Sequence, residues 1–73
     1  MISPDLSPET RDAILTVQRS EITEYHIYQR LAVRIDDDHN RDVVERIAQQ
    51  EKQHYDFWRE YTGQDVRPSS LQI

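Results

Sequence analysis

The chain contains no cysteine and only one glycine, Gly63, among its 73 residues. Without cysteine it can form no disulfide, no thiolate zinc site and no iron–sulfur cluster. A single glycine excludes the glycine-rich loops that bind phosphates and dinucleotides. No apolar run approaches the ~18 residues of a membrane span, and an excess of 14 acidic over 9 basic side chains predicts no nucleic-acid binding. These absences leave a small acidic domain whose expected ligands are cations.

Two long segments lack both glycine and proline and carry apolar residues at helical spacing. They cover about residues 8–36 and about residues 41–61. The remaining tail, residues 62–73, is rich in turn-forming residues, and we interpret it as a linker. A short connection makes consecutive helices antiparallel neighbours. The sequence therefore predicts one all-α domain over residues 1–73, built as an antiparallel two-helix hairpin.

The predicted helices have recognisable ends. Ser7 followed by Pro8 is typical of a helix start, because serine caps the first turn and proline suits the first helical position. Asn40 is the expected cap of the second helix. Gly63 supplies the expected C-terminal stop.

A line of predicted core positions follows each helix with heptad spacing. Most of these positions are apolar, which is typical of a helix–helix interface. The polar exceptions are Glu21, Glu24, Glu51 and His54. The middle of one helix faces the middle of the other in an antiparallel hairpin, so these four side chains are predicted to share one layer.

Burying three carboxylates and an imidazole in an apolar layer costs several kcal/mol per charge unless a cation compensates. No lysine or arginine occupies a neighbouring core position. Glu51 and His54 lie one turn apart on the same helical face and offer one oxygen and one nitrogen ligand, a mixture that suits iron, manganese or zinc. The alternative is a polar layer that only fixes the register of the helices.

The remaining aromatic side chains are expected to be structural. Tyr25 and Tyr55 are interpreted as core residues, and Trp58 and Tyr61 as core or interface anchors. His26 lies off the predicted core line and is expected at the surface.

One hairpin offers too few ligands and only half a bundle. Two hairpins related by a two-fold axis make four helices and double the ligand set. The result is Glu from two helices and Glu-x-x-His from the other two, the ligand plan of ferritin-like di-iron bundles. We therefore predict a homodimer.

The segment EITEYHIYQRLA (residues 21–32), followed by EKQH (residues 51–54), resembles the rubrerythrin and ferritin-like superfamily. The separation of the two glutamates and the opening LSPET (residues 6–10) are similar to encapsulated ferritins, two-helix chains that dimerise to build the metal site. The first segment and HYDFWREYTGQDVRPSSL (residues 54–71) look more like another branch, the ferritin-like N-terminal domain of vacuolar-iron-transporter-type membrane proteins. The resemblance covers roughly residues 6–71.

The resemblance implies a role for each matching residue. Glu21 would be the carboxylate ligand of the first helix, Glu51 the carboxylate that bridges two metals, and His54 the terminal nitrogen ligand. Tyr28 would hydrogen-bond and orient a ligand carboxylate. Glu24 departs from the encapsulated-ferritin pattern and would replace Glu21, supplement it, or form an entry site.

The function implied is a ferroxidase that oxidises Fe²⁺ with O₂ at a di-iron centre between two protomers, with manganese as the other metal that shares these ligands. Dimers would assemble further, as in the rings of encapsulated ferritins, and iron would pass to an encapsulin shell or a fused membrane transporter. The location expected is the cytoplasm, either inside such a shell or tethered to a membrane. Three alternatives stay open: a metal-sensing or metal-delivery module without turnover, a peroxidase that prefers hydrogen peroxide, and a purely structural dimerisation hairpin.

Overall fold

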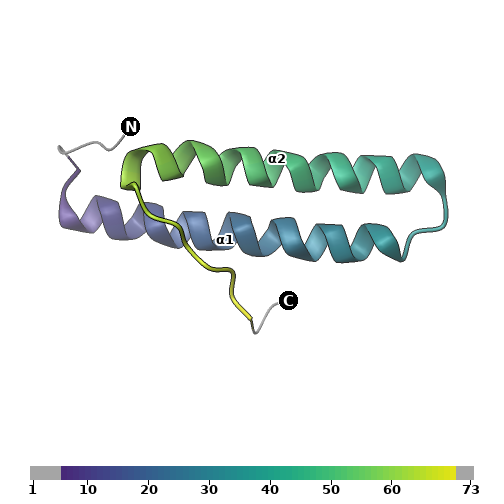
Figure 1. Cartoon of the computed structure of the whole chain (residues 1–73), viewed down its shortest axis with the longest axis horizontal. Helices are drawn as coiled ribbons and strands as arrows, with labels where there is room; N and C mark the ends of the chain where they lie inside the picture. Colours follow the sequence, from purple (N-terminus) through teal and green to yellow (C-terminus); the bar gives the residue numbers. More distant parts are fainter. Residues whose placement is uncertain (1–5, 71–73) are drawn as a thin grey trace.

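The computed structural model describes residues 6–70 and shows two α-helices packed side by side in an antiparallel hairpin (Figure 1). Helix α1 spans Pro8–Val33 and helix α2 spans Asp38–Thr62. The two helices contact each other along their lengths, which confirms the prediction of an all-α hairpin. The chain measures 46 × 24 × 14 Å along its principal axes, so it forms a single layer of helices.

The helix ends show how the sequence sets the bounds. The Ser7 hydroxyl accepts a hydrogen bond from the Thr10 amide (3.2 Å), and Gly63 ends α2 in the left-handed region with φ of 66°. Asn40 is not the cap of α2. Asp37 takes this place, because its carboxylate accepts a hydrogen bond from the Asn40 amide at 2.8 Å. α2 therefore begins at residue 38 rather than about 41, and α1 ends at residue 33 rather than about 36.

A single arginine fastens the connection between the helices. Arg41 donates from Nε to the carbonyl of Ile35 (3.0 Å) and from Nη2 to the carbonyl of Asp36 (3.1 Å). Its Nη1 pairs with the carboxylate of Asp38 at 3.0 Å. One guanidinium thus satisfies two carbonyl groups just past the end of α1, where no helical partner follows.

The line of closest contact between the helices differs from the predicted core line. The most buried side chains are Gln18, Ile22, Thr23 and Ala32 in α1 and Ala48, Tyr55 and Thr62 in α2. Tyr55 was predicted to be a core residue, and its burial confirms this. All seven, however, lie off the predicted heptad line. The predicted positions flank this line on one side and are half-buried or exposed. Positions with heptad spacing face the axis of a larger bundle, whereas two neighbouring helices touch along an adjacent strip.

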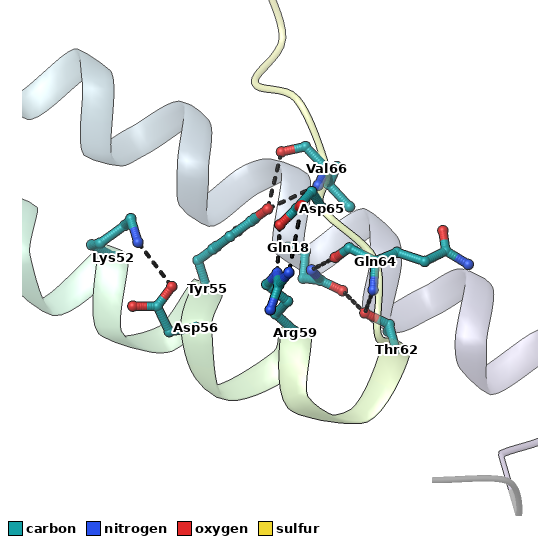
Figure 2. Close-up of polar contacts among 9 residues, drawn as sticks. All are labelled: Gln18, Lys52, Tyr55, Asp56, Arg59, Thr62, Gln64, Asp65 and Val66. Carbon is teal, nitrogen blue, oxygen red and sulfur yellow. Dashed lines mark hydrogen bonds and ion pairs between the residues drawn. The ribbon is translucent and has the colours of Figure 1, made fainter. Parts of the chain in front are cut away.

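The tail after α2 is not a free linker over the residues that the structure describes. It turns back at Gly63 and crosses α1, as Figure 1 shows. Gln18 and Tyr55 hydrogen-bond to its main chain (Figure 2). The hairpin therefore has a covered face, where residues 64–69 pack, and an opposite open face.

The open face is the side of the hairpin where the predicted core positions gather. It is defined by Val17, Glu21 and Leu31 of α1 and by Glu51, His54 and Tyr61 of α2. At about 100° of rotation per residue, these positions point away from the side of each helix that meets the tail. The polar layer and the apolar seam predicted from the sequence both lie there.

Neither helix carries an apolar stretch of the length that crossing a bilayer requires, as far as residues 6–70 are concerned.

Candidate metal centre

Three of the predicted site residues meet near the middle of the hairpin. The Nδ1 atom of His54 lies 3.5 Å from Oε2 of Glu21 and 3.6 Å from Oε1 of Glu51. Glu21 comes from α1, and the other two come from successive turns of α2. The two carboxylate side chains are only 15 % and 18 % exposed, whereas the imidazole is 58 % exposed. The two carboxylates of the layer are therefore largely buried, and the histidine is its solvent-exposed member.

Glu21 holds a buried oxygen that the rest of the chain does not satisfy. Its Oε2 is shielded from solvent and has no hydrogen-bond partner among residues 6–70. The nearest polar group, the imidazole of His54, stands beyond ordinary hydrogen-bond length at 3.5 Å. A buried acceptor of this kind costs about 1–3 kcal/mol, and more when it is charged. An orphaned carboxylate oxygen beside an imidazole is chemically suited to a cation.

The fourth polar residue, Glu24, acts on Glu51. A hydrogen bond to the Glu24 side chain, together with burial and the repulsion of that second carboxylate, raises the pKa of Glu51 to about 7. Two carboxylates that share a site cannot both ionise cheaply, so a proton stays between them. A proton is the smallest cation that can occupy this position, and a metal ion would replace it with more charge.

Among residues 6–70, the structure shows no ion pair between Lys52 and these carboxylates. Lys52 follows Glu51 directly in the sequence, but its Nζ pairs with Asp56 at 2.8 Å and lies over the ring of Tyr55, 5.6 Å from its centroid. Figure 2 shows this lysine directed at Asp56, on the side of α2 that carries Tyr55.

Tyr28 lies one turn beyond Glu24 and two turns beyond Glu21, on the same face of α1. Its side chain is half-buried. Within residues 6–70 the structure shows no hydrogen bond from its hydroxyl to the carboxylates. The orienting role of Tyr28 stays a prediction.

In the region described, no group of three or more His, Asp or Glu side chains is arranged to hold a metal ion by itself. Glu21, Glu51 and His54 form a cluster of potential metal-ligand atoms on the open face. Side chains of these types are ligands that iron and manganese bind in proteins.

More apolar side chains surround this cluster than the sequence predicted. Val17, Leu31 and Tyr61 are exposed on the open face, and Val43 and Phe57 are exposed at its edge. Phe57 packs against Trp58 and Tyr61 with ring centroids 4.9 and 5.3 Å away. The missed residue Phe57 had a signal in the sequence: it lies three residues after His54 and four before Tyr61, which places it beside both on a helix.

No protein-family model, no curated protein and no solved structure matches this chain. The case for the site therefore depends on the geometry and chemistry of its own residues.

Proposed function

We propose that the chain forms a homodimer through its open face and oxidises Fe²⁺ with O₂ at a pair of iron sites enclosed between the two protomers. The observation that carries this proposal is the buried, unpartnered Oε2 of Glu21 beside His54. A polar group in this state calls for a positive partner, and the donors around it are those that iron binds.

A second copy of the chain is the occupant that best fits the open face. The layer is 46 Å long and 24 Å wide, so one broad face has a projected area larger than the roughly 800 Å² per partner that stable interfaces bury. Exposed apolar side chains, including Val17, Leu31 and Tyr61, surround the acidic layer. A two-fold axis through the layer would cover these side chains and bring a second Glu21, Glu51 and His54 to the first set.

The residues would divide the work by their chemistry. Glu51 lies next to both Glu24 and His54 and would bridge two ions. Glu21 and His54 would each hold one side of an ion. Carboxylates stabilise Fe³⁺ more than Fe²⁺ because their charge interacts with the higher charge of the product.

The proposed reaction is balanced by its own substrates. Two Fe²⁺ ions each lose one electron and become Fe³⁺, and one O₂ takes up both electrons and two protons to leave as hydrogen peroxide. The acidic surface, with net charge −5, favours the approach of Fe²⁺ by raising its local concentration. One hairpin encloses no storage cavity, so we expect the Fe³⁺ to be handed to a shell or a transporter.

An anaerobic Fe²⁺ titration followed by exposure to air tests the proposal. We expect saturation near one iron per chain, the mass of a dimer in solution, and rapid growth of absorbance at 300–350 nm, with one O₂ consumed for every two irons. Glu51→Ala/His54→Ala is expected to lose all of the binding and the oxidation. The matched control is Glu45→Ala/His39→Ala, which removes the same two residue types from exposed positions of α2.

The other readings have their own outcomes. Tight binding with no gain in oxidation rate over buffer would replace the ferroxidase by a metal-sensing or metal-delivery module. Faster oxidation with hydrogen peroxide than with O₂ would indicate a peroxidase. Dimers that bind no iron, and gain stability in Glu51→Leu, would leave a structural hairpin.

A further inference from the structure

The tail is held mainly by hydrogen bonds to its main chain. The Gln18 amide donates to the carbonyl of Gln64 (3.0 Å), and the Val66 amide donates to the hydroxyl of Tyr55 (2.8 Å). Further along, the amide of Ser69 donates to the hydroxyl of Thr23 at 2.8 Å. Figure 2 shows the first two of these contacts side by side.

A fourth contact and an ion pair complete the attachment. Arg19 donates to the carbonyl of Arg67 at 3.0 Å, and Arg59 pairs with the carboxylate of Asp65. The proximity of Arg59 lowers the pKa of Asp65. Helix side chains therefore bind successive main-chain groups of an extended segment, as a peptide-binding groove does.

Three of the helix residues that make these contacts are among the most buried of those that the structure describes. Gln18 is 0 % and Thr23 is 1 % exposed, and Tyr55 is also buried. Thr62 donates to the side-chain oxygen of Gln18 at 2.6 Å, so the amide is satisfied on both sides. Without the tail, these polar groups and the neighbouring Ile22 would form a second partly apolar face, opposite the open one.

A hairpin with two such faces can stack without limit. One self-complementary face gives a closed two-fold dimer. A second self-associating face on the opposite side allows chains to add repeatedly and form open assemblies. The covered face has its partner within the same chain, so only the open face is available to a second copy.

We infer that residues 64–69 act as an intramolecular cover that crosses α1 next to the end of α2 (Figure 1) and restricts self-association to the face that carries Glu21, Glu51 and His54. The cover would make the dimer the end point of assembly through these two faces. This inference rests on the proposed dimer for its consequence, but the docking of the tail and its effect on mass can be measured without metal.

Proline substitutions in the tail test the cover and leave both helices unchanged. Val66→Pro/Ser69→Pro removes the two amide donors that reach Tyr55 and Thr23. The matched control, Ser70→Pro, keeps both donors. Hydrogen exchange of amides in residues 64–70 reports whether the tail is released, circular dichroism reports the helices, and light scattering reports mass, all in metal-free buffer.

We expect fast exchange in the tail of the double variant, unchanged helix content, and a mean mass that at least about doubles and rises with concentration, as open assembly requires. Ser70→Pro should match the native chain. Slow exchange in the double variant would overturn the claim that these contacts hold the tail. A released tail with the native mass would overturn the claim that it limits assembly.

The failure of the proposed dimer would look different. A native chain that stays monomeric would refute association through the open face. This result would leave the inference about the tail intact if the double variant still assembled, because the face uncovered by release of the tail would then be the one that self-associates. A synthetic peptide of residues 64–73 added in trans should reverse that assembly, and its failure to do so would overturn the cover.

Discussion

The two broad faces of this hairpin contain buried polar groups in opposite states. On the covered face, the amide of Gln18 and the hydroxyl of Thr23 have their hydrogen-bond partners within the same chain. On the open face, Glu21 has a buried oxygen with no partner in the described part of the chain, and the pKa of Glu51 is raised to about 7. The polar groups of the covered face are paired within the chain, whereas a buried oxygen of the open face has no partner among residues 6–70.

The comparison separates structural polar groups from candidate functional ones. Burial alone does not distinguish them, because both faces bury polar side chains. The difference lies in satisfaction: a fully paired network specifies one structure, and an unpaired group retains the capacity to bind something else. Substitutions on the two faces should therefore affect different measurements.

The largest expected effect is on dimer formation. Leu31→Glu places a charge on the apolar part of the open face, and a two-fold axis puts two such charges in each dimer. We expect the dissociation constant to rise at least about a hundredfold, or about 3 kcal/mol, by sedimentation equilibrium. Val33→Glu is the matched control, because Val33 is 83 % exposed and lies off the open face. Equal effects of the two substitutions would remove the open face as the dimer interface.

The next effect concerns the covered face. Gln18→Ala leaves the hydroxyl of Thr62 and the carbonyl of Gln64 without their partner in a buried position. We expect the free energy of unfolding to fall by about 2 kcal/mol, measured by urea titration at fixed protein concentration. The exposed Gln53→Ala should change it by less than about 0.5 kcal/mol. A loss of iron binding in Gln18→Ala without a loss of stability would contradict the separation of the faces.

A smaller effect distinguishes the faces by pH. The pKa of Glu51 is raised to about 7 in the folded chain, so the folded state holds a proton that the unfolded state has lost. Stability without metal should therefore fall as pH rises from about 4.5 to about 7, and stay low above that range. Glu51→Gln removes the cost of ionisation, and it should raise stability at pH 8 by about 1 kcal/mol after solvent screening.

Urea titrations at pH 5 and pH 8 in the presence of a chelator measure this difference. The gain in Glu51→Gln should be larger at pH 8 than at pH 5, while the exposed Glu45→Gln should show none. A gain that is larger at pH 5 would mean that the carboxylate is stabilised by ionisation, and that the open face already contains a positive partner.

The smallest effect is expected where α2 gives way to the tail. Gly63→Ala must adopt the positive φ of 66°, which costs a residue with a Cβ about 1 kcal/mol. The cost should appear in unfolding and in faster amide exchange in residues 64–69. The dimer dissociation constant should stay unchanged, since the open face is untouched. A shift in dimer affinity larger than the shift in stability would show that the two faces are coupled.

The sequence predicted the elements well because their signals are local. Helical spacing, the capping serine and Gly63 each act within a few residues, and the structure has all three. The N-cap of α2 was misplaced because Asp37 and Asn40 are both good capping residues three positions apart. The choice between them depends on the path of the connection, which Arg41 also fastens.

Helical spacing predicted the contacts of the candidate site but not those of the tail. Glu21, Glu51 and His54 were predicted to share a layer because helical spacing in an antiparallel hairpin brings them together. In the structure, Nδ1 of His54 lies within 3.6 Å of a carboxylate oxygen of each glutamate. The partners of Gln18 and Thr23 could not be predicted, since each contacts main-chain groups 46 residues away. Main-chain groups are identical in every residue, so the sequence has no signal for them.

The contacts of the Arg41 guanidinium also suggest the order in which parts of the chain fold. Its contacts join residues at most six positions apart, whereas docking of the tail joins residues 46 apart. Closing a short loop costs less chain entropy and takes less time than closing a long one. We therefore expect the helices to pair first from the connection outward, and the tail to dock last. On the return path the tail should leave first, so each molecule spends brief intervals as an uncovered hairpin before it unfolds.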